Sequence, residues 1–108
     1  MLVNPDVREV TVEQLDAARS TGTEVIDVRS PQEYAQGHVP GAVNVPLEEL
    51  LAAPASAVPD GAHVVCQSGR RSAEAARALQ QAGVAAVSVA GGTAAWIDSG
   101  REIEGGKQ

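Results

Sequence analysis

Short apolar runs alternate along this chain with stretches of helical periodicity, and that alternation is the feature that most constrains its fold. Runs rich in Val and Ile predict strands, whereas apolar residues at helical spacing predict helices between them. The alternation predicts an α/β domain with a mainly parallel sheet covered by helices on both faces. We predict strands at about 7–10, 23–28, 42–45, 63–66 and 84–89, and helices at about 11–20, 31–36, 46–51, 72–82 and from 93 onward.

Local sequence patterns set several of these boundaries. Thr11 and Gln14 have the spacing of a capping box, and Ser30 before Pro31 predicts a helix N-cap. We expect Thr93 to cap the last helix, which would place Trp96 and Ile97 against the core. Residues 52–61 are expected to form a surface connection.

The only cysteine of the chain follows the predicted strand at 63–66 and precedes a helix. We call residues 66–71 the cysteine loop. A loop before a helix N-terminus directs several backbone N–H groups at one point, where the helix dipole adds positive charge. Gly69 permits a positive φ or a close backbone approach, and Arg70 and Arg71 add positive charge. This setting favours a thiolate on Cys66.

Three stretches in this order resemble the sequence motifs of rhodanese-type sulfurtransferases. The first comprises residues 27–34 (Asp-Val-Arg-Ser-Pro-Gln-Glu-Tyr) and 37–46 (Gly-His-Val-Pro-Gly-Ala-Val-Asn-Val-Pro). The second is Cys-Gln-Ser-Gly-Arg-Arg-Ser at 66–72, and the third is Gly-Gly-Thr-Ala-Ala-Trp at 91–96. The resemblance covers most of the chain and implies a doubly wound, five-stranded rhodanese-like fold.

The resemblance also implies a function. In that family the cysteine carries a transferable sulfur as a persulfide, so Cys66 is the expected catalytic nucleophile. The donor would be thiosulfate or a protein persulfide, and the acceptor cyanide, a thiol or a protein; no cofactor is implied. Because the chain has no second cysteine, the persulfide would wait for an external acceptor. The other residues expected to bind substrate, mainly through backbone donors, are Gln67, Ser68, Gly69 and Ser72.

The arginines near the predicted site have different expected roles. Arg71 would bind the substrate anion, since arginine in a first helical turn opposes the helix dipole and needs another reason to be there. The resemblance implies that Arg70 faces substrate, and the alternative is that it is solvated. The resemblance likewise implies that Arg29 can contact the substrate anion, and the alternative is that it pairs with Asp27 or Glu33. We expect Asp27 to be structural rather than a general base.

Two other functions use similar residues. Phosphatases and arsenate reductases of this fold have one residue more between cysteine and arginine, whereas here four residues separate Cys66 from Arg71. The shorter loop favours sulfur over phosphate. A sulfur-relay or binding module that serves a partner protein in cofactor or tRNA sulfuration would retain the same loop. His38 lies in a turn that is structural in the family, and the lone cysteine and two dispersed histidines have no metal-ligand spacing.

Length, charge and cysteine content complete the prediction. A chain of 108 residues fits a single domain, which we place at 1–108 with its core at about 7–103 and a frayed tail at 104–108. A net charge of −6 and only two aromatic residues argue against nucleic acid as a partner. We expect no membrane span, and a free thiol favours the reducing cytoplasm.

Overall fold

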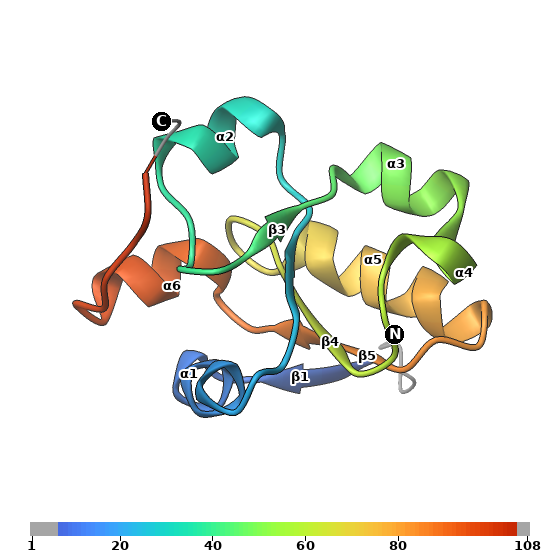
Figure 1. Ribbon diagram of the computed structural model, residues 1–108, viewed down its shortest axis with the longest axis horizontal. Coiled ribbons are helices and arrows are strands. Elements are labelled where there is room, and N and C mark those ends of the chain that lie inside the picture. The colour runs from blue at the N-terminus through green and yellow to red at the C-terminus, as the bar shows by residue number, and fades with distance from the viewer. Residues whose placement is uncertain (1–6, 106–108) are drawn as a thin grey trace.

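The computed structural model describes residues 7–105, which form a five-stranded sheet and six helices (Figure 1). The strands are β1 (Arg8–Val10), β2 (Val25–Asp27), β3 (Val43–Asn44), β4 (Ala62–Val65) and β5 (Ala86–Val89). The helices are α1 (Val12–Ser20), α2 (Pro31–Gln36), α3 (Leu47–Ala52), α4 (Pro54–Ala57), α5 (Arg70–Gln81) and α6 (Gly92–Asp98).

All neighbouring strands pair in parallel, in the order β1-β5-β4-β2-β3. β4 is therefore central, with β5 on one side and β2 on the other. This arrangement confirms the predicted doubly wound α/β fold. Asp27 of β2 is in register with Val65 of β4, so the segments that follow these two strands leave the sheet at the same edge. In open parallel sheets, ligands gather at the carboxyl edge.

The side chains of the central strands alternate between two cores, one on each face of the sheet. The first core contains Val64 with Leu50 of α3 and Leu79 of α5, and the second contains Val65 with Leu15 of α1 and Trp96 of α6. Helices α3, α4 and α5 thus cover one face, and α1 and α6 cover the other (Figure 1).

The helix after β4 begins earlier than the predicted residue 72. Gly69 is its N-cap and has φ of 110°, in the left-handed region that glycine adopts without strain. The chain therefore turns directly from the loop into α5, whose first turn includes Arg70 and Arg71. Both cationic side chains are consequently carried by the helix.

Three further predictions are wrong in detail. The stretch 52–61 contains α4, and Val58 packs into the core. Thr93 does not cap α6 but is fully buried within it, because Gly91 takes the N-cap position. Ile97 is 47% exposed whereas Trp96 is 1% exposed, because neighbouring positions on a helix point about 100° apart.

The tail that is predicted to fray begins at residue 104, and the structure pairs this first residue with the turn after α2. Glu104 and His38 exchange both backbone hydrogen bonds, at 2.8 and 2.9 Å. Trp96 Nε1 donates to the Glu102 carbonyl oxygen at 2.6 Å, which holds the same segment against α6. The rest of the predicted tail, 106–108, and residues 1–6 lie outside the described residues.

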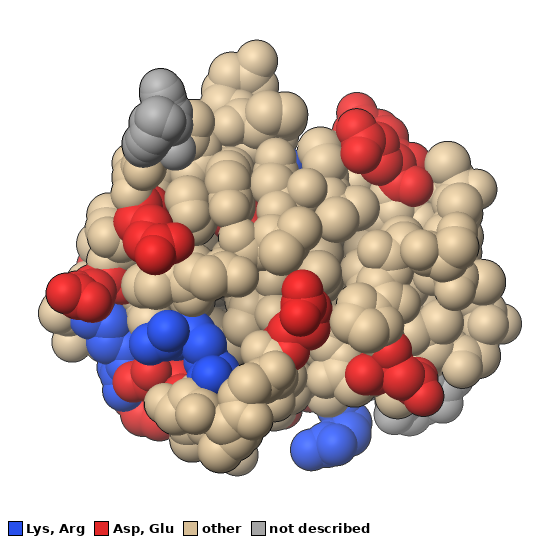
Figure 2. Space-filling view, in the orientation of Figure 1, with Lys and Arg blue, Asp and Glu red and all other residues tan. Residues whose placement is uncertain are grey.

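Acidic side chains are scattered over the face seen in Figure 2, whereas the basic ones on it gather mainly near α1. Arg19 and Arg101 each lie 5.5 Å from the centre of the Trp96 ring. These two cations therefore have a packing role away from the cysteine loop. Between residues 7 and 105, none of the helices is both long and apolar enough to cross a membrane.

Candidate active site

Cys66 follows the last residue of β4, at the carboxyl edge of the sheet. Its side chain is 1% exposed and forms no disulfide. The strand leads into the cysteine loop, and α5 then starts at Arg70 with its N-terminus beside the sulfur. The thiol is consequently held between a strand end and the positive end of a helix dipole.

Several donors surround the sulfur of Cys66. The Gly69 N–H group donates to Sγ at 3.0 Å, and the Ser72 hydroxyl oxygen lies 3.5 Å from Sγ. Burial by itself would raise the pKa of the Cys66 thiol, but bonds from the Ser72 hydroxyl and from the backbone N–H groups of Ser72, Gly69 and Ser68 outweigh it. The net result is a lowered pKa, so the site favours the thiolate.

The N-terminus of α6 supports the cysteine loop from behind. The N–H groups of Thr93 and Ala94 donate to the carbonyl oxygens of Cys66 and Gln67, at 2.8 and 3.1 Å. A Cβ atom at Gly92 would lie 2.7 Å from the Gln67 carbonyl oxygen, closer than real Cβ atoms approach, and Gly92 has φ of 58°. Only glycine lets this helix end approach the loop so closely.

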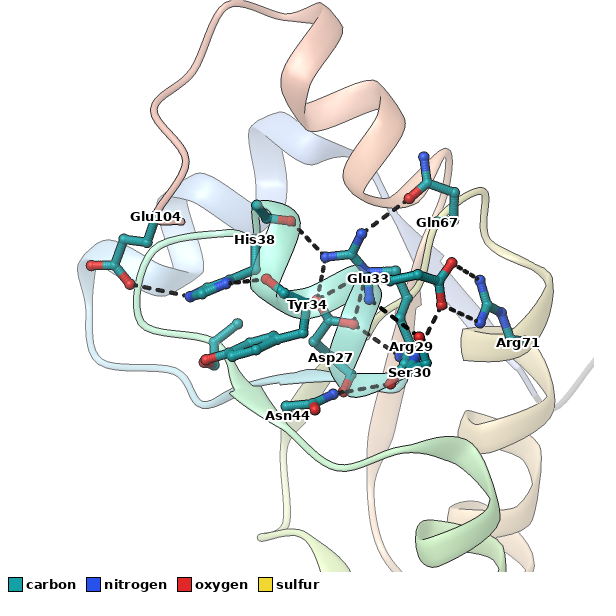
Figure 3. Close-up of polar contacts among 12 residues, drawn as sticks. Asp27, Arg29, Ser30, Glu33, Tyr34, His38, Asn44, Gln67, Arg71 and Glu104 are labelled. Atoms are coloured by element: carbon teal, nitrogen blue, oxygen red, sulfur yellow. Dashed lines mark hydrogen bonds and ion pairs between the residues drawn. The ribbon is translucent and has the colours of Figure 1, made fainter. Parts of the chain in front are cut away.

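Arg29 extends from the end of β2 into a buried polar cluster (Figure 3). Its Nη2 donates to Asp27 Oδ2 at 2.9 Å and to the Gly37 carbonyl oxygen at 2.7 Å, while its Nη1 donates to Gln67 Oε1 at 3.1 Å. The arginine is 4% exposed and Asp27 is fully buried. Of the two roles that the sequence left open, the structure has Arg29 paired with Asp27.

Arg71 forms a two-point ion pair with Glu33 (Figure 3). The Nη1 and Nη2 atoms lie 2.9 and 3.0 Å from the two carboxylate oxygens. The Arg71 side chain, followed by the backbone N–H of Ser30, lowers the pKa of Glu33 from 4.5 to about 2. The same contact raises the pKa of Arg71. The positive charge of Arg71 is therefore already balanced by the Glu33 carboxylate before any substrate binds.

Arg70 differs from the other two arginines. Its side chain is exposed, and within residues 7–105 it has no ion-pair partner. Gln67 and Ser68 are exposed beside it at the rim of the loop. The structure thus brings the predicted substrate-binding residues together at one edge of the sheet, but leaves only one of the three arginine charges unbalanced.

His38 does not join this group. Its ring stacks on Tyr34 with centroids 3.7 Å apart, and its Nδ1 lies 2.8 Å from the Tyr34 carbonyl oxygen. These contacts are those of a structural residue. His63 is only partly buried, on β4. Among the described residues, no three His, Cys, Asp or Glu side chains gather as metal ligands would.

Two residues that contact the predicted site residues were not themselves predicted as part of the site. Glu33, noted above only as a possible partner of Arg29, balances Arg71 instead. Ser88 is fully buried on β5, and its Oγ lies 2.7 Å from Ser72 Oγ. The sequence held one indication of Ser88, because it is the single polar residue in a buried strand.

Comparison with known proteins finds similarity to rhodanese-like domains and to sulfurtransferases. The sequence model of the rhodanese-like domain family matches residues 11–99. Thiosulfate sulfurtransferase PspE of Escherichia coli K12 is 46% identical over 70 residues, covering 62% of this chain and 67% of that protein. A sulfurtransferase of Allochromatium vinosum is 37% identical over 103 residues, covering 90% of this chain and 94% of that protein. A crystal structure of a rhodanese-related protein from Thermoplasma volcanium superposes with a TM-score of 0.81 at 32% identity, covering 90% and 97% of the two chains.

Proposed function

This chain belongs to the rhodanese-like domain family, and from that premise we propose that it transfers sulfane sulfur through a persulfide on Cys66. The observation that carries the proposal is the polar environment of Sγ, to which the Gly69 N–H group donates at 3.0 Å and from which the Ser72 hydroxyl oxygen lies 3.5 Å away. The lowered pKa of Cys66 makes the thiolate, which is the nucleophilic form, more available.

Thiosulfate is the proposed small-molecule donor. The Cys66 thiolate attacks the outer sulfur of thiosulfate, and the sulfur–sulfur bond of the donor breaks with its electron pair leaving on sulfite. The enzyme then carries Cys66–S–S⁻, and the total charge is unchanged. The N–H groups of Ser68 and Gly69 that face Sγ are suited to hold the sulfur atoms as negative charge moves between them.

The charge balance at the cysteine loop supports an anionic donor. Arg29 is paired with Asp27 and Arg71 with Glu33, so these four side chains together contribute no net charge. Arg70 adds one positive charge at the rim, where an approaching dianion would meet it. We therefore assign to Arg70 the main role in attracting thiosulfate, and to Arg29 the role of orienting the Gln67 amide.

Discharge of the persulfide requires an external acceptor, because the chain has a single cysteine. Cyanide attacking the outer sulfur would give thiocyanate and return the thiolate, and a thiol or a protein could take the sulfur in the same way. We propose the reducing cytoplasm as the site of action, since its thiol pool keeps a free cysteine reduced and offers acceptors.

The decisive experiment is intact mass after incubation with thiosulfate, followed by cyanide, on wild type and Cys66→Ala. Wild type should gain the mass of one sulfur atom and lose it with cyanide, while the variant should gain nothing. Sulfur gained by the variant would overturn the assignment of Cys66. Loading of wild type from a protein persulfide but not from thiosulfate would favour the sulfur-relay function.

A further inference from the structure

We propose that Ser88 is a positioning residue for the sulfur chemistry: its hydroxyl donates to Ser72 Oγ and thereby directs the Ser72 proton at Cys66 Sγ. The effect on catalysis rests on the function proposed above, but the effect on the thiol itself does not. Ser88 comes from β5 and does not touch the sulfur, so it acts only through Ser72. We call Ser72 and Ser88 the serine pair.

The three polar groups lie in a row inside the protein. Ser72 Oγ is 3.5 Å from Cys66 Sγ and 2.7 Å from Ser88 Oγ. Both serines are fully buried and Cys66 is 1% exposed. Ser88 lies on the face of β5 that is turned toward α5, because Ala86, two residues earlier, packs in the same core as Leu79 of α5.

Counting protons fixes the direction of these hydrogen bonds when the sulfur is ionised. A thiolate has no proton, so a bond between it and Ser72 requires the Ser72 hydroxyl to donate. The short contact to Ser88 must then be donated by Ser88, whose hydroxyl has no other partner among the described residues. With a neutral thiol the row can reverse, because the S–H group can donate to Ser72 Oγ. The direction of both hydrogen bonds in the row therefore depends on whether Cys66 is a thiolate or a neutral thiol.

The Gly69 carbonyl oxygen competes for the Ser72 proton, at 3.2 Å. That carbonyl already accepts a bond from the Ala73 N–H group, and it carries no charge. Hydrogen bonds to an ionised acceptor are about twice as strong as those between neutral groups. The thiolate is thus the preferred acceptor as long as Ser88 supplies the second bond to Ser72 Oγ.

The charged neighbours of the sulfur are few. Arg71 of α5 acts on Cys66 through its charge, but Glu33 of α2 balances it, and Arg29 after β2 is balanced by Asp27. β5 and the first turn of α6 contribute no charged side chain. Arg70 of α5 is exposed and has no ion-pair partner among the described residues. Within the protein, the hydroxyl and N–H dipoles therefore face Sγ beside balanced ion pairs, and the serine pair supplies the side-chain hydrogen bond among them.

The same arrangement would assist turnover. When an acceptor takes the outer sulfur from Cys66–S–S⁻, the sulfur–sulfur bond breaks and its electron pair returns to Sγ. Negative charge therefore grows on Sγ in the transition state, where the Ser72 proton can stabilise it. Loss of Ser88 should slow this discharge as well as raise the pKa of the resting thiol.

The test is a titration of Cys66 by the ultraviolet absorbance of its thiolate, with Cys66→Ala as the blank that subtracts the single tyrosine. One cysteine in the chain makes the assignment unambiguous. Ser88→Ala should raise the pKa of Cys66 by about one pH unit, the size expected for loss of part of a hydrogen bond to a charged group. Ser88→Thr, which keeps the hydroxyl, should restore most of the difference.

Two comparisons separate this role from general damage to β5. Val87→Ala removes core methyl groups from the neighbouring position on the other face of the same strand, so it should lower stability but leave the pKa of Cys66 unchanged. Ser72→Ala combined with Ser88→Ala should titrate like Ser72→Ala alone, because Ser88 acts only through Ser72.

A wild-type pKa in Ser88→Ala would overturn the proposal, as would equal rises in Ser88→Ala and Val87→Ala or an additive double variant. Failure of the function proposed above would give a different result. Wild type would then not gain sulfur from a donor, but the pKa of Cys66 would still differ between wild type and Ser88→Ala. Persulfide discharge by cyanide, measured on preloaded protein, should slow severalfold in Ser88→Ala and recover in Ser88→Thr.

Discussion

At the scale of single residues, the three arginines of the candidate site perform two different tasks. Arg29 and Arg71 are fixed by carboxylates, at 2.9 Å in each ion pair, and they orient neighbouring groups. Arg70 is exposed and has no ion-pair partner among the described residues, so it can offer its whole charge to a ligand. Substrate attraction and loop geometry can therefore be altered independently.

Substituting Arg70→Gln should raise KM for thiosulfate about fivefold and leave kcat nearly unchanged. An exposed charge pair contributes up to about 1 kcal/mol, and loss of binding shared by ground and transition states appears in KM. Steady-state kinetics at low and high ionic strength would measure this, because added salt should shrink the difference. Arg77→Gln, an exposed position farther along α5, is the matched control. An unchanged KM in Arg70→Gln would contradict the assigned role.

The Glu33–Arg71 pair should make the free energy of unfolding depend on pH. The pKa of Glu33 is lowered from 4.5 to about 2, chiefly by the Arg71 side chain. A carboxyl with a lowered folded-state pKa stabilises the fold above its unfolded pKa, and that stability is lost as the pH falls through the folded value. Because the Glu33 side chain is 35% exposed, solvent screening limits the contribution to about 1 kcal/mol.

Glu33→Gln should therefore be less stable than wild type by about 1 kcal/mol near neutral pH and should converge with it as the pH approaches 2. Urea unfolding across a series of pH values would measure both effects. Arg71→Gln should flatten the same part of the pH dependence, since it removes the other half of the pair. If both variants kept the wild-type slope, the pair would not contribute in solution.

At the scale of elements, the site depends on how closely the N-terminus of α6 approaches the cysteine loop. The Thr93 N–H group donates to the Cys66 carbonyl oxygen at 2.8 Å, and Gly92 leaves no room for a side chain. The short strand–helix connection at 89–92 thus sets the position of the loop that carries the nucleophile.

Gly92→Ala should lower the free energy of unfolding by about 3 kcal/mol, since a methyl group would overlap backbone carbonyls that cannot move without shifting the loop. Gly100→Ala is the control: Gly100 has φ of 82°, but a Cβ atom added there would meet no described atom within 4 Å, so it should cost only the backbone strain of about 1 kcal/mol. Denaturant unfolding would compare them. Equal losses would show that the close approach is unimportant.

The elements themselves were largely predictable, because their determinants are local. The capping box of α1 and the Ser30 N-cap of α2 both form as predicted, and the structure adds Glu33 as the second half of a capping box at α2. Helix α4 was missed because it has only four residues and no apolar stripe. The start of α5 was not predicted because it depends on the positive φ of Gly69. Glycine can adopt this angle, but its presence in the sequence does not show that it does.

Side-chain partners within the site were less predictable, because they depend on which strands become neighbours. Arg29 and Gln67 are 38 positions apart, as are Glu33 and Arg71. The sequence alone left open whether Arg29 would contact the substrate anion or pair with Asp27 or Glu33. The contact between β2 and β4 brings each pair together, and it decides that Glu33 meets Arg71.

At the scale of the whole molecule, the C-terminal segment joins two parts that are distant in sequence. It leaves α6, passes the edge of Trp96, and pairs with the turn after α2 through His38 and Glu104. Figure 1 shows this segment reaching from α6 to α2. The turn after α2 also supplies the Gly37 carbonyl oxygen that accepts a bond from Arg29, so the segment supports the buried polar cluster from outside.

Ending the chain at Arg101 should therefore destabilise the fold by about 2 kcal/mol, because Trp96 Nε1 would lose its hydrogen-bond acceptor and the backbone pairing of Glu104 with His38 would be lost. Trp96 is the only tryptophan, so a red shift of its fluorescence would report its exposure, and thermal unfolding would give the loss of stability. Glu104→Gln keeps every backbone bond of the segment and should change neither measurement appreciably. An unshifted spectrum in the shortened chain would mean that the tryptophan is held by the sheet and by α1 alone, and that the C-terminal segment adds no support to the site.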